Sequence, residues 1–177
     1  MSEKYQTILG GGGAIGTPLA KELKDYTRNI RVAARNPKKV NPTDEAFTLD
    51  LTNRQQTFEA VKGSEIVYMV AGLKYTTKTW EEQWPGVFDN VLDACKAEGA
   101  KLVFFDNVYP YGRVEGPMTE DTPFNPCSKK GEIRAKLDLK LMEEYKRGNI
   151  EAVIVRGADF YGPRVGSSVF NMLVVDN

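Results

Sequence analysis

Glycines crowd a short stretch near the start of the chain, with Gly10, Gly13 and Gly16 at intervals of three residues. Because glycine has no Cβ atom, such a turn can adopt unusual torsions and lets a diphosphate come close to the backbone. The first turn of a following helix offers that anion unpaired N–H groups and the positive end of the helix dipole. We therefore expect the three glycines, with Ala14 and Ile15, to bind a dinucleotide. The alternative is a turn that binds no ligand.

Three elements must hold this turn in place. The apolar run at residues 7–9 predicts a strand before it, and Ile15, Leu19 and Leu23, four residues apart, predict a helix after it. A second strand is expected over Ile30–Ala34. Together these elements make a βαβ unit, the setting in which a glycine motif is most informative.

The residues after the second strand indicate which dinucleotide is bound. An NAD site usually carries Asp or Glu there, to accept a hydrogen bond from the ribose 2′-hydroxyl. No acidic residue occurs between Ile30 and Lys39, whereas Arg35 lies 19 residues after Gly16. A guanidinium group can bind a 2′-phosphate with two hydrogen bonds. The sequence therefore favours NADP(H) over NAD(H), with a solvated basic turn as the alternative.

The rest of the chain alternates between strand and helix patterns. Further strands are expected at residues 46–50, 65–71, 101–105 and 151–156, and further helices at residues 54–62, 80–98 and 129–147. Within the second of these helices, Pro85 predicts a break or a fresh start near Gln83 and Trp84. The alternation predicts an α/β fold, a doubly wound parallel Rossmann sheet of about six strands with helices on both faces.

Three further expectations concern structure rather than chemistry. Thr52 or Asn53 is expected to cap the helix at residues 54–62. Trp80 and Trp84 share a helical spacing with the apolar residues that follow them, which predicts a core-facing side. Cys95 lies in the same pattern and is expected to be a small core residue.

Residues that follow the strands are the next candidates for a site, because ligands bind at the carboxyl ends of strands in open α/β sheets. Asp50 follows the third strand and suits two roles about equally, contact with the adenine amino group or an anion at a helix end. Ala71 and Gly72 are small enough for a cofactor to pass above the sheet. Asn107 and Tyr109 follow the fifth strand.

Composition excludes several kinds of function. The 177 residues include 24 basic and 24 acidic ones, so no uniform field is available to attract nucleic acid or an anionic membrane. The chain has no histidine, which excludes Ser-His-Asp and Cys-His sites within it and any histidine-ligated metal site. No metal site and no disulfide framework are expected. No apolar run approaches the ~20 residues of a membrane span and no signal peptide is evident, so a cytoplasmic location is expected.

Several ordered motifs resemble the NAD-dependent epimerase/dehydratase family, which belongs to the extended or atypical short-chain dehydrogenases/reductases. The matching residues are the glycine motif, Asp50 and Leu51, Ala71 and Gly72, Tyr111 and Gly112, Arg156, and Tyr161, Gly162 and Pro163. The resemblance covers nearly the whole chain. It implies NAD(P)(H) binding, with Leu51 among the contacts, and for many members hydride transfer to or from a sugar carbon or a small ketone.

The family's catalytic residues are replaced in this chain. Its Ser or Thr, four residues before the Tyr-Gly tyrosine, is Asn107 here. The best alignment of its Tyr-x-x-x-Lys motif puts Lys130 and Arg134 in place of the tyrosine and the lysine. In the family, the tyrosine is the general acid/base and the lysine holds the nicotinamide ribose.

The replacements suggest specific roles. Arg134 keeps the charge and donors needed to hold the ribose, and Asn107 can donate a hydrogen bond to a substrate carbonyl. Lys130 can transfer protons only where burial or neighbouring charges strongly favour its neutral form. Tyr109 or Tyr111 can supply the missing phenol. The alternative is that Lys129, Lys130 and Arg134 form a solvated helix face.

The resemblance also implies a domain organisation. Family members usually carry a small C-terminal substrate domain. We expect residues 1–165 to form the NAD(P)-binding Rossmann domain and residues 166–177 to begin a truncated or missing substrate region. A small-molecule substrate is expected, with no nucleic-acid or membrane partner, and pairing of exposed helices into a homodimer is compatible with the fold.

Two functional hypotheses follow from these patterns. The first is an NADP(H)-binding oxidoreductase-like or epimerase/dehydratase-like domain that acts on a carbonyl or sugar-type substrate by hydride transfer, with NAD as the alternative cofactor. The second is a dinucleotide-binding sensor or regulator of the same superfamily that has lost catalysis. An inactive fragment is compatible with either.

Overall fold

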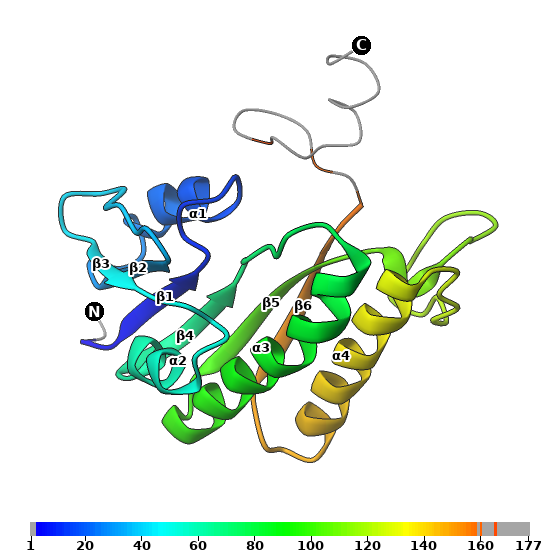
Figure 1. Cartoon of the computed structure of the whole chain (residues 1–177). Helices are drawn as coiled ribbons and strands as arrows, with labels where there is room; N and C mark the ends of the chain where they lie inside the picture. Colours follow the sequence, from blue (N-terminus) through cyan, green and yellow to red (C-terminus); the bar gives the residue numbers. More distant parts are fainter. Residues whose placement is uncertain (1–2, 159, 161–164, 166–177) are drawn as a thin grey trace, which may run out of the picture.

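The computed structural model describes residues 3–158, 160 and 165 of the chain. The described part holds six strands in one parallel sheet of order β3-β2-β1-β4-β5-β6 (Figure 1). The strands are β1 (Tyr5–Leu9), β2 (Ile30–Ala34), β3 (Glu45–Thr48), β4 (Ser64–Met69), β5 (Lys101–Asn107) and β6 (Ala152–Gly157). The helices are α1 (Gly16–Leu23), α2 (Arg54–Val61), α3 (Thr77–Glu98) and α4 (Lys129–Lys146), with a 3₁₀ turn, η1 (Tyr109–Tyr111). The expected doubly wound α/β fold is confirmed.

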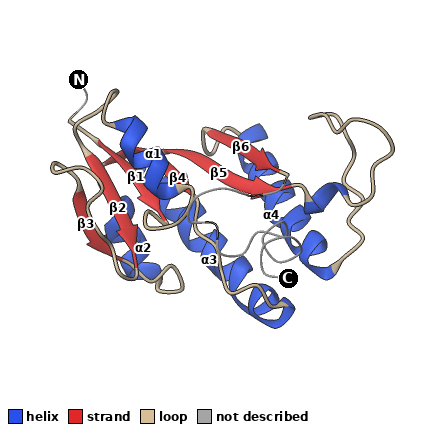
Figure 2. Cartoon of the chain, turned by 90° about the horizontal axis from the view of Figure 1, so that it is seen from above, coloured by secondary structure: helices blue, strands red, loops and turns tan. Residues whose placement is uncertain are grey.

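Helices cover both faces of the sheet, α1 on one and α2, α3 and α4 on the other (Figure 2). Side chains alternate between the faces along each strand. On β1, Ile8 packs in the small cluster with Leu23 of α1, whereas the next residue, Leu9, packs in the large cluster with Trp84 of α3. Strand β1 is therefore buried on both sides, as is usual for a central parallel strand.

The direction of winding reverses beside β1. The chain runs outward from β1 through β2 to β3, and α2 then returns it to β4 on the other side of β1. Strands β1 and β4 are paired with Leu9 opposite Met69, so both end at the same level. The connections that leave these two ends diverge, and ligands bind at such a switch point in open α/β sheets. We call this region of the chain the crevice.

Helix α3 is continuous and contains Pro85, so the expected break beside Trp84 is wrong. A proline inside a helix removes one backbone hydrogen bond. Here Trp80 and Trp84 are buried before it and Val87 and Phe88 after it, and the burial of these large side chains offsets that loss. Pro85 itself is exposed, so its ring takes no space in the core.

The strand boundaries lie within two residues of those expected. The extension of β5 to Asn107 has a consequence for the site, because it carries Asp106 and Asn107 inside the sheet. The predicted cap of α2 is Asn53, whose side chain accepts a hydrogen bond from the Gln56 N–H at 3.1 Å. Burial raises the pKa of the Cys95 thiol to about 12, and the expectation that it is a core residue is confirmed.

Some expectations fall outside the described residues. These are the motif at residues 161–163 and the region at residues 166–177. Among the helices that the structure describes, none has the length and apolar character needed to cross a membrane. Within the same residues, no three Cys, Asp or Glu side chains gather as metal ligands.

Phe88 tests the main core. Its side chain is fully buried and its ring lies 5.1 Å from that of Phe104 between centroids. Phe88→Ala is expected to lower the free energy of unfolding by about 3–5 kcal/mol, because it removes a large apolar group and leaves a cavity. Urea unfolding followed by circular dichroism measures this loss. Val153→Ala is the control, since Val153 is 45% exposed, and an equal loss in both variants would contradict the assignment of the core.

Candidate functional site

The glycine turn connects β1 to α1 and lies against the end of β4. Gly10 has a φ of +100°, and a Cβ atom there would lie 2.6 Å from the Cα of Ala71. A Cβ atom on Gly16 would lie 2.7 Å from the Gly10 carbonyl oxygen. These two glycines are therefore required by the packing of the chain itself, since a side chain at either position would push the turn apart.

Gly13 has no such reason to be a glycine. A Cβ atom there would lie 3.4 Å from its nearest described neighbour, the Gly10 oxygen, and on Gly12 it would meet no described atom within 4 Å. Neither residue has a positive φ. The space in front of this part of the turn is open, as the close approach of a diphosphate requires.

The start of α1 likewise has no described side chain that occupies its free N–H groups. Its N-cap residue, Ile15, makes no side-chain capping bond, and the first turn carries no acidic side chain. By contrast, Asn53, Thr76 and Ser128 cap the other three helices with their side chains. The first N–H groups of an α-helix have no partner within the helix. The turn and the uncapped helix start fit the phosphates of a dinucleotide.

Arg35 and Asp50 lie beyond the ends of adjacent strands. Ala34 of β2 pairs with Thr48 of β3, and each of the two charged residues follows shortly after. Both side chains are exposed. The hydrogen bond from the Thr52 N–H, at 2.9 Å, is the main cause that lowers the pKa of Asp50, and the nearby charge of Arg35 adds to it. A basic and an acidic group thus share this edge of the crevice.

Asp50 has a structural role of its own. One of its carboxylate oxygens accepts both the N–H and the hydroxyl of Thr52, the latter at 2.8 Å, and so shapes the turn that enters α2. This arrangement favours the role of Asp50 as an anion at a helix end. Contact between Asp50 and adenine stays a prediction. Next to it, Leu51 is half-buried and its carbonyl accepts a bond from the Asn90 amide at 2.9 Å.

Ala71 and Gly72 continue the crevice from β4. Ala71 touches the glycine turn at Gly10, whereas Gly72 is exposed and has no described atom within 4 Å of the place of a Cβ. The predicted passage above the sheet is therefore open at Gly72. Whether a cofactor uses it stays a prediction.

Asn107, Tyr109 and the start of α4 are brought together at the end of β5. The Asn107 carboxamide oxygen accepts the Tyr109 N–H at 2.9 Å, which orients the carboxamide and starts η1. A Cβ atom on Gly131 would lie 2.6 Å from the Tyr109 carbonyl oxygen, so only a glycine lets α4 come this close. The neighbouring residue, Lys130, is held beside η1 as a result.

Lys130 lies against aromatic rings rather than in solvent. Its Nζ atom is 3.4 Å from the centroid of the Tyr75 ring and 5.7 Å from that of Trp80. The hydroxyls of Tyr75 and Tyr109 are 2.7 Å apart, within hydrogen-bond distance. The sequence patterns missed Tyr75, because it lies in the loop after β4 and no fixed spacing connects it to α4.

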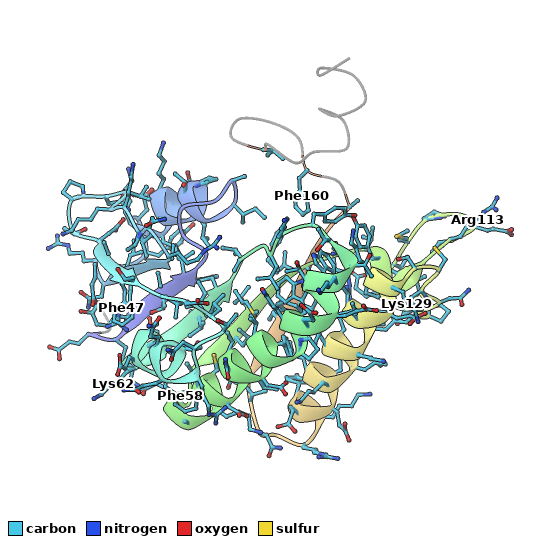
Figure 3. All side chains as sticks on the ribbon, in the orientation of Figure 1. Phe47, Phe58, Lys62, Arg113, Lys129 and Phe160 are labelled. Atoms are coloured by element: carbon cyan, nitrogen blue, oxygen red, sulfur yellow. The ribbon has the colours of Figure 1, made fainter. Side chains whose placement is uncertain are left out.

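Arg134 is buried, so the hypothesis that it belongs to a solvated helix face is wrong. It is 3% exposed, and its Nε and Nη2 atoms donate to one carboxylate oxygen of Asp106. The guanidinium carbon lies 4.2 Å from the centroid of the Trp84 ring. Contact of Arg134 with a ribose stays a prediction. Lys129, by contrast, lies on the outer side of the first turn of α4 and pairs with Glu132 at 3.0 Å (Figure 3).

A second arginine completes a buried group that we call the ionic cluster, consisting of Asp106, Arg134, Asp138 and Arg156. Arg156 of β6 donates to Asp106 at 3.2 Å and to Asp138 at 2.8 Å. It also donates to the carbonyl oxygen of Asn107 at 3.0 Å. The cluster therefore connects β5, α4 and β6 next to Asn107.

Asp138 is the unusual member of the ionic cluster. Burial, together with the charge of Asp106, raises the pKa of Asp138 to about 7, although Arg156 opposes the shift. Among the described residues, one Asp138 carboxyl oxygen and the Arg134 Nη1 atom are buried without a hydrogen-bond partner. The carboxyl of Asp138 is thus held partly protonated near neutral pH.

Tyr111 does not share the position of Tyr109. It is 5% exposed, and the guanidinium of Arg156 lies 4.9 Å from its ring centroid. Of the two tyrosines proposed to supply a phenol, Tyr109 is the one whose hydroxyl meets that of Tyr75, and the Tyr75 ring is the one that Lys130 contacts.

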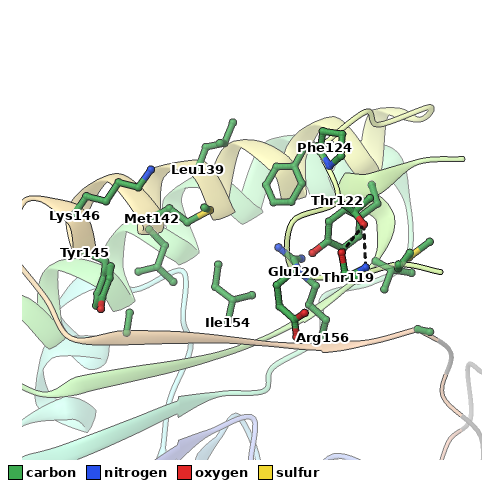
Figure 4. A pocket seen from close by; sticks show the side chains of 17 residues that line it. Thr119, Glu120, Thr122, Phe124, Leu139, Met142, Tyr145, Lys146, Ile154 and Arg156 are labelled. Atoms are coloured by element: carbon green, nitrogen blue, oxygen red, sulfur yellow. Dashed lines mark hydrogen bonds between the residues drawn. The ribbon is translucent and has the colours of Figure 1, made fainter. Parts of the chain in front are cut away.

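A large groove in the described part of the chain lies elsewhere. It measures about 1030 Å³ and lies between α4, β6 and the loop at residues 118–124 (Figure 4). Its lining is largely apolar and includes Phe124, Leu139, Met142 and Ile154. None of the residues predicted to bind the cofactor lines it. Size alone therefore does not mark the site, and the crevice at the strand ends remains the candidate.

Comparison with known proteins gives one family. The model of the NAD dependent epimerase/dehydratase family matches residues 7–174. Among curated proteins, no sequence matches the chain. Many solved structures are similar to it.

Three of these structures illustrate the likeness. UDP-glucose 4-epimerase from Brucella ovis, in complex with NAD, is 18% identical with a TM-score of 0.76, over 88% of this chain and 52% of that one. UDP-N-acetylglucosamine 4-epimerase from Methanobrevibacter ruminantium M1, in complex with UDP-N-acetylmuramic acid, is 21% identical with a TM-score of 0.79, over 93% and 57%. A dTDP-glucose 4,6-dehydratase from Streptomyces venezuelae, with NAD and TYD bound, is 17% identical with a TM-score of 0.79, over 90% and 57%. The chain spans little more than half of their length, and at these identities the likeness shows the fold.

The ionic cluster makes a prediction about pH. Because the folded pKa of Asp138 lies above its unfolded value, the folded state binds the extra proton between about pH 4 and about pH 7. The stability that this provides is complete below the unfolded pKa and is lost as the pH rises through the folded one. Asp138→Asn is expected to flatten this fall, measured by urea unfolding across the same range. The exposed Asp25→Asn is the control, and parallel curves for wild type and Asp138→Asn would contradict the assignment.

Proposed function

The chain belongs to the NAD dependent epimerase/dehydratase family, and from this premise we propose that it binds a nicotinamide dinucleotide across the end of its sheet. In this proposal it serves hydride transfer at a carbonyl or sugar-type carbon. The observation that carries the proposal is that the glycines of the turn differ in what requires them. Gly10 and Gly16 are required by the packing of the chain, whereas Gly13 is not and faces open space beside an uncapped helix.

The proposed cofactor is NADP(H), with NAD(H) as the alternative. Arg35 supports NADP(H), because an exposed guanidinium at the end of β2 suits a 2′-phosphate. Two observations weigh on the other side. The Brucella ovis and Streptomyces venezuelae structures are described with NAD. The charge of Asp50, which lies near Arg35, would also oppose a phosphate.

The proposed substrate is a nucleotide sugar or another small molecule with a carbonyl or hydroxyl carbon. The three similar structures are named for UDP- and dTDP-linked sugars. Since this chain spans little more than half of their length, we assign none of its residues to recognition of the nucleotide part of such a substrate.

Each residue at the reacting end has a proposed task. The bound nicotinamide would supply or accept the hydride. Asn107, oriented by the Tyr109 N–H, would donate a hydrogen bond to the substrate oxygen. Lys130 would provide positive charge over the ring of Tyr75, whose hydroxyl meets that of Tyr109. Arg134 would act indirectly, because its ion pair with Asp106 fixes the position of the first turns of α4.

A second candidate function is dinucleotide binding without catalysis. It is favoured by the buried position of Arg134, which stands where the family has its ribose-holding lysine and is 3% exposed and ion-paired. Such a sensor would bind the dinucleotide, change its association with a protein partner and show no turnover. The two functions are separated by assaying turnover and association with the same preparation.

The glycine turn is tested by Gly13→Ala. The added methyl group meets only one described neighbour, at an ordinary contact distance, so the free energy of unfolding should change by less than about 0.5 kcal/mol. The dissociation constants of NADPH and NADH should both rise by about tenfold or more, because the methyl group occupies the space of the diphosphate. Calorimetric titration measures both. Gly86→Ala, also in open space, is the control, and unchanged binding by Gly13→Ala would refute the proposed contact.

The cofactor preference is tested by Arg35→Ala. Loss of the guanidinium should weaken NADPH binding by about tenfold or more and leave NADH binding within about twofold, because only NADPH carries the 2′-phosphate. Arg28→Ala, another exposed arginine, is the matched control. Equal weakening of both nucleotides, or of neither, would remove Arg35 from the 2′-phosphate site.

A further inference from the structure

Three segments that are distant in the sequence meet at one cluster beside the crevice. Tyr75 comes from the loop between β4 and α3, Tyr109 from η1, and Lys130 from the start of α4. Their contacts are close, with 2.7 Å between the phenol oxygens and 3.4 Å between the Lys130 Nζ and the Tyr75 ring centroid. We call this group the phenol cluster. Its members come from three separate segments, a loop, a 3₁₀ turn and a helix, so the arrangement is a product of the tertiary fold.

Trp80 supports the phenol cluster from below. It is 5% exposed and packs edge-on against Tyr75 at 5.6 Å and stacked with Tyr109 at 6.3 Å, between ring centroids. Both tyrosine rings therefore rest on one buried side chain, which fixes their mutual position. Tyr75 itself is 55% exposed, so a substrate can reach it.

The phenol cluster lies along the path that a dinucleotide would take. Ala71 touches Gly10 of the glycine turn, and Tyr75 lies four residues further along the same connection. Tyr109 and Asn107 follow the neighbouring strand, β5. A dinucleotide that begins on the glycine turn and crosses above β4 would place its far end next to these groups. In Figure 1 the upper ends of α3 and α4 lie side by side, and the loop that leaves the upper end of β4 leads to the start of α3.

The paired hydroxyls have the properties of a proton relay. A phenol donates one hydrogen bond and also accepts. When Tyr109 donates to Tyr75, the hydrogen of Tyr75 is directed to a third oxygen, and a proton that leaves Tyr75 can be replaced from Tyr109. The ammonium group of Lys130 lies over the ring of Tyr75, where it stabilises negative charge left on the phenol.

We propose that Tyr75 is a catalytic residue that exchanges a proton with the substrate oxygen, with Tyr109 as its relay and Lys130 as its charge partner. This rests on the proposed function, because it assumes a bound nicotinamide. In reduction, the carbonyl carbon gains a hydrogen with its electron pair from the reduced nicotinamide, which is left oxidised. The carbonyl oxygen takes the proton of the Tyr75 hydroxyl, Tyr75 recovers a proton from Tyr109, and water resupplies Tyr109. Oxidation of a hydroxyl carbon follows the same steps in reverse.

The test compares the full chain with Tyr75→Phe, which keeps the ring and its contacts with Lys130 and Trp80 and removes only the hydroxyl. Two probes are used, UDP-glucose with oxidised dinucleotide and 9,10-phenanthrenequinone with NADPH. The turnover number of Tyr75→Phe is expected to fall by about 10²-fold or more. Its dissociation constant for NADPH, measured by calorimetry, should stay within about twofold of the wild type. Tyr26→Phe, at a tyrosine that is 76% exposed on another part of the chain, should behave as wild type.

Every outcome decides the matter. Loss of turnover with unchanged NADPH affinity supports the catalytic role. Wild-type turnover in Tyr75→Phe overturns it and leaves the proposed function in place. Loss of NADPH affinity in Tyr75→Phe also overturns it, because the residue would then position the cofactor. If the wild type binds NADPH but turns over neither probe, the catalytic role fails and the sensor function is supported. If the wild type binds neither NADPH nor NADH, the proposed function itself fails.

Discussion

The buried carboxylate of Asp106 determines how β5, the first turns of α4 and β6 are held together at this end of the sheet. Two guanidinium groups, from Arg134 and Arg156, bind it from different elements. Removing charges from water is costly, so such a contact persists only when its partners hold each other in good geometry. Asn107 follows Asp106 directly, and Lys130 lies one helical turn before Arg134. The positions of both polar groups at the surface are therefore set by an ion pair beneath them.

The other end of the site depends on contact between backbones. Where Gly10 meets Ala71, the connections from β1 and β4 are closer than any side chain would allow. This contact closes the floor of the crevice, and the turn then rises to Gly13 and the start of α1 in open space. The same short motif thus contains residues that serve folding and one that the folded chain does not need. A sequence motif alone cannot separate these roles, because it lists glycines without their neighbours.

The features that could be predicted from the sequence are those with a local cause along the chain. The features that depend on tertiary contacts could not be predicted. The strands, the helices and the glycine turn were predictable because spacing along the chain produces them. The uninterrupted path of α3 through Pro85 was not, since it depends on the burial of Trp80 and Trp84 against the sheet. Arg134 was assigned to the site from an alignment, but its burial against Asp106 involves a strand 28 residues away. Tyr75 carried no signal at all, because its partners lie on two other connections.

The two replaced positions of α4 can now be understood through helix geometry. Residues four apart lie on the same side of a helix, so Lys130 and Arg134 both face the sheet and its ends. The long side chain of Arg134 points into the protein, where it pairs with Asp106 below the surface. Lys130, one turn closer to the crevice, meets the aromatic rings of Tyr75 in the β4–α3 loop and Trp80 in α3. A lysine at this position cannot offer a phenol, but it brings a positive charge to the ring of Tyr75, whose hydroxyl meets that of Tyr109. The positions of α4 that the family's motif marks are thus held by contacts that come from different parts of the chain.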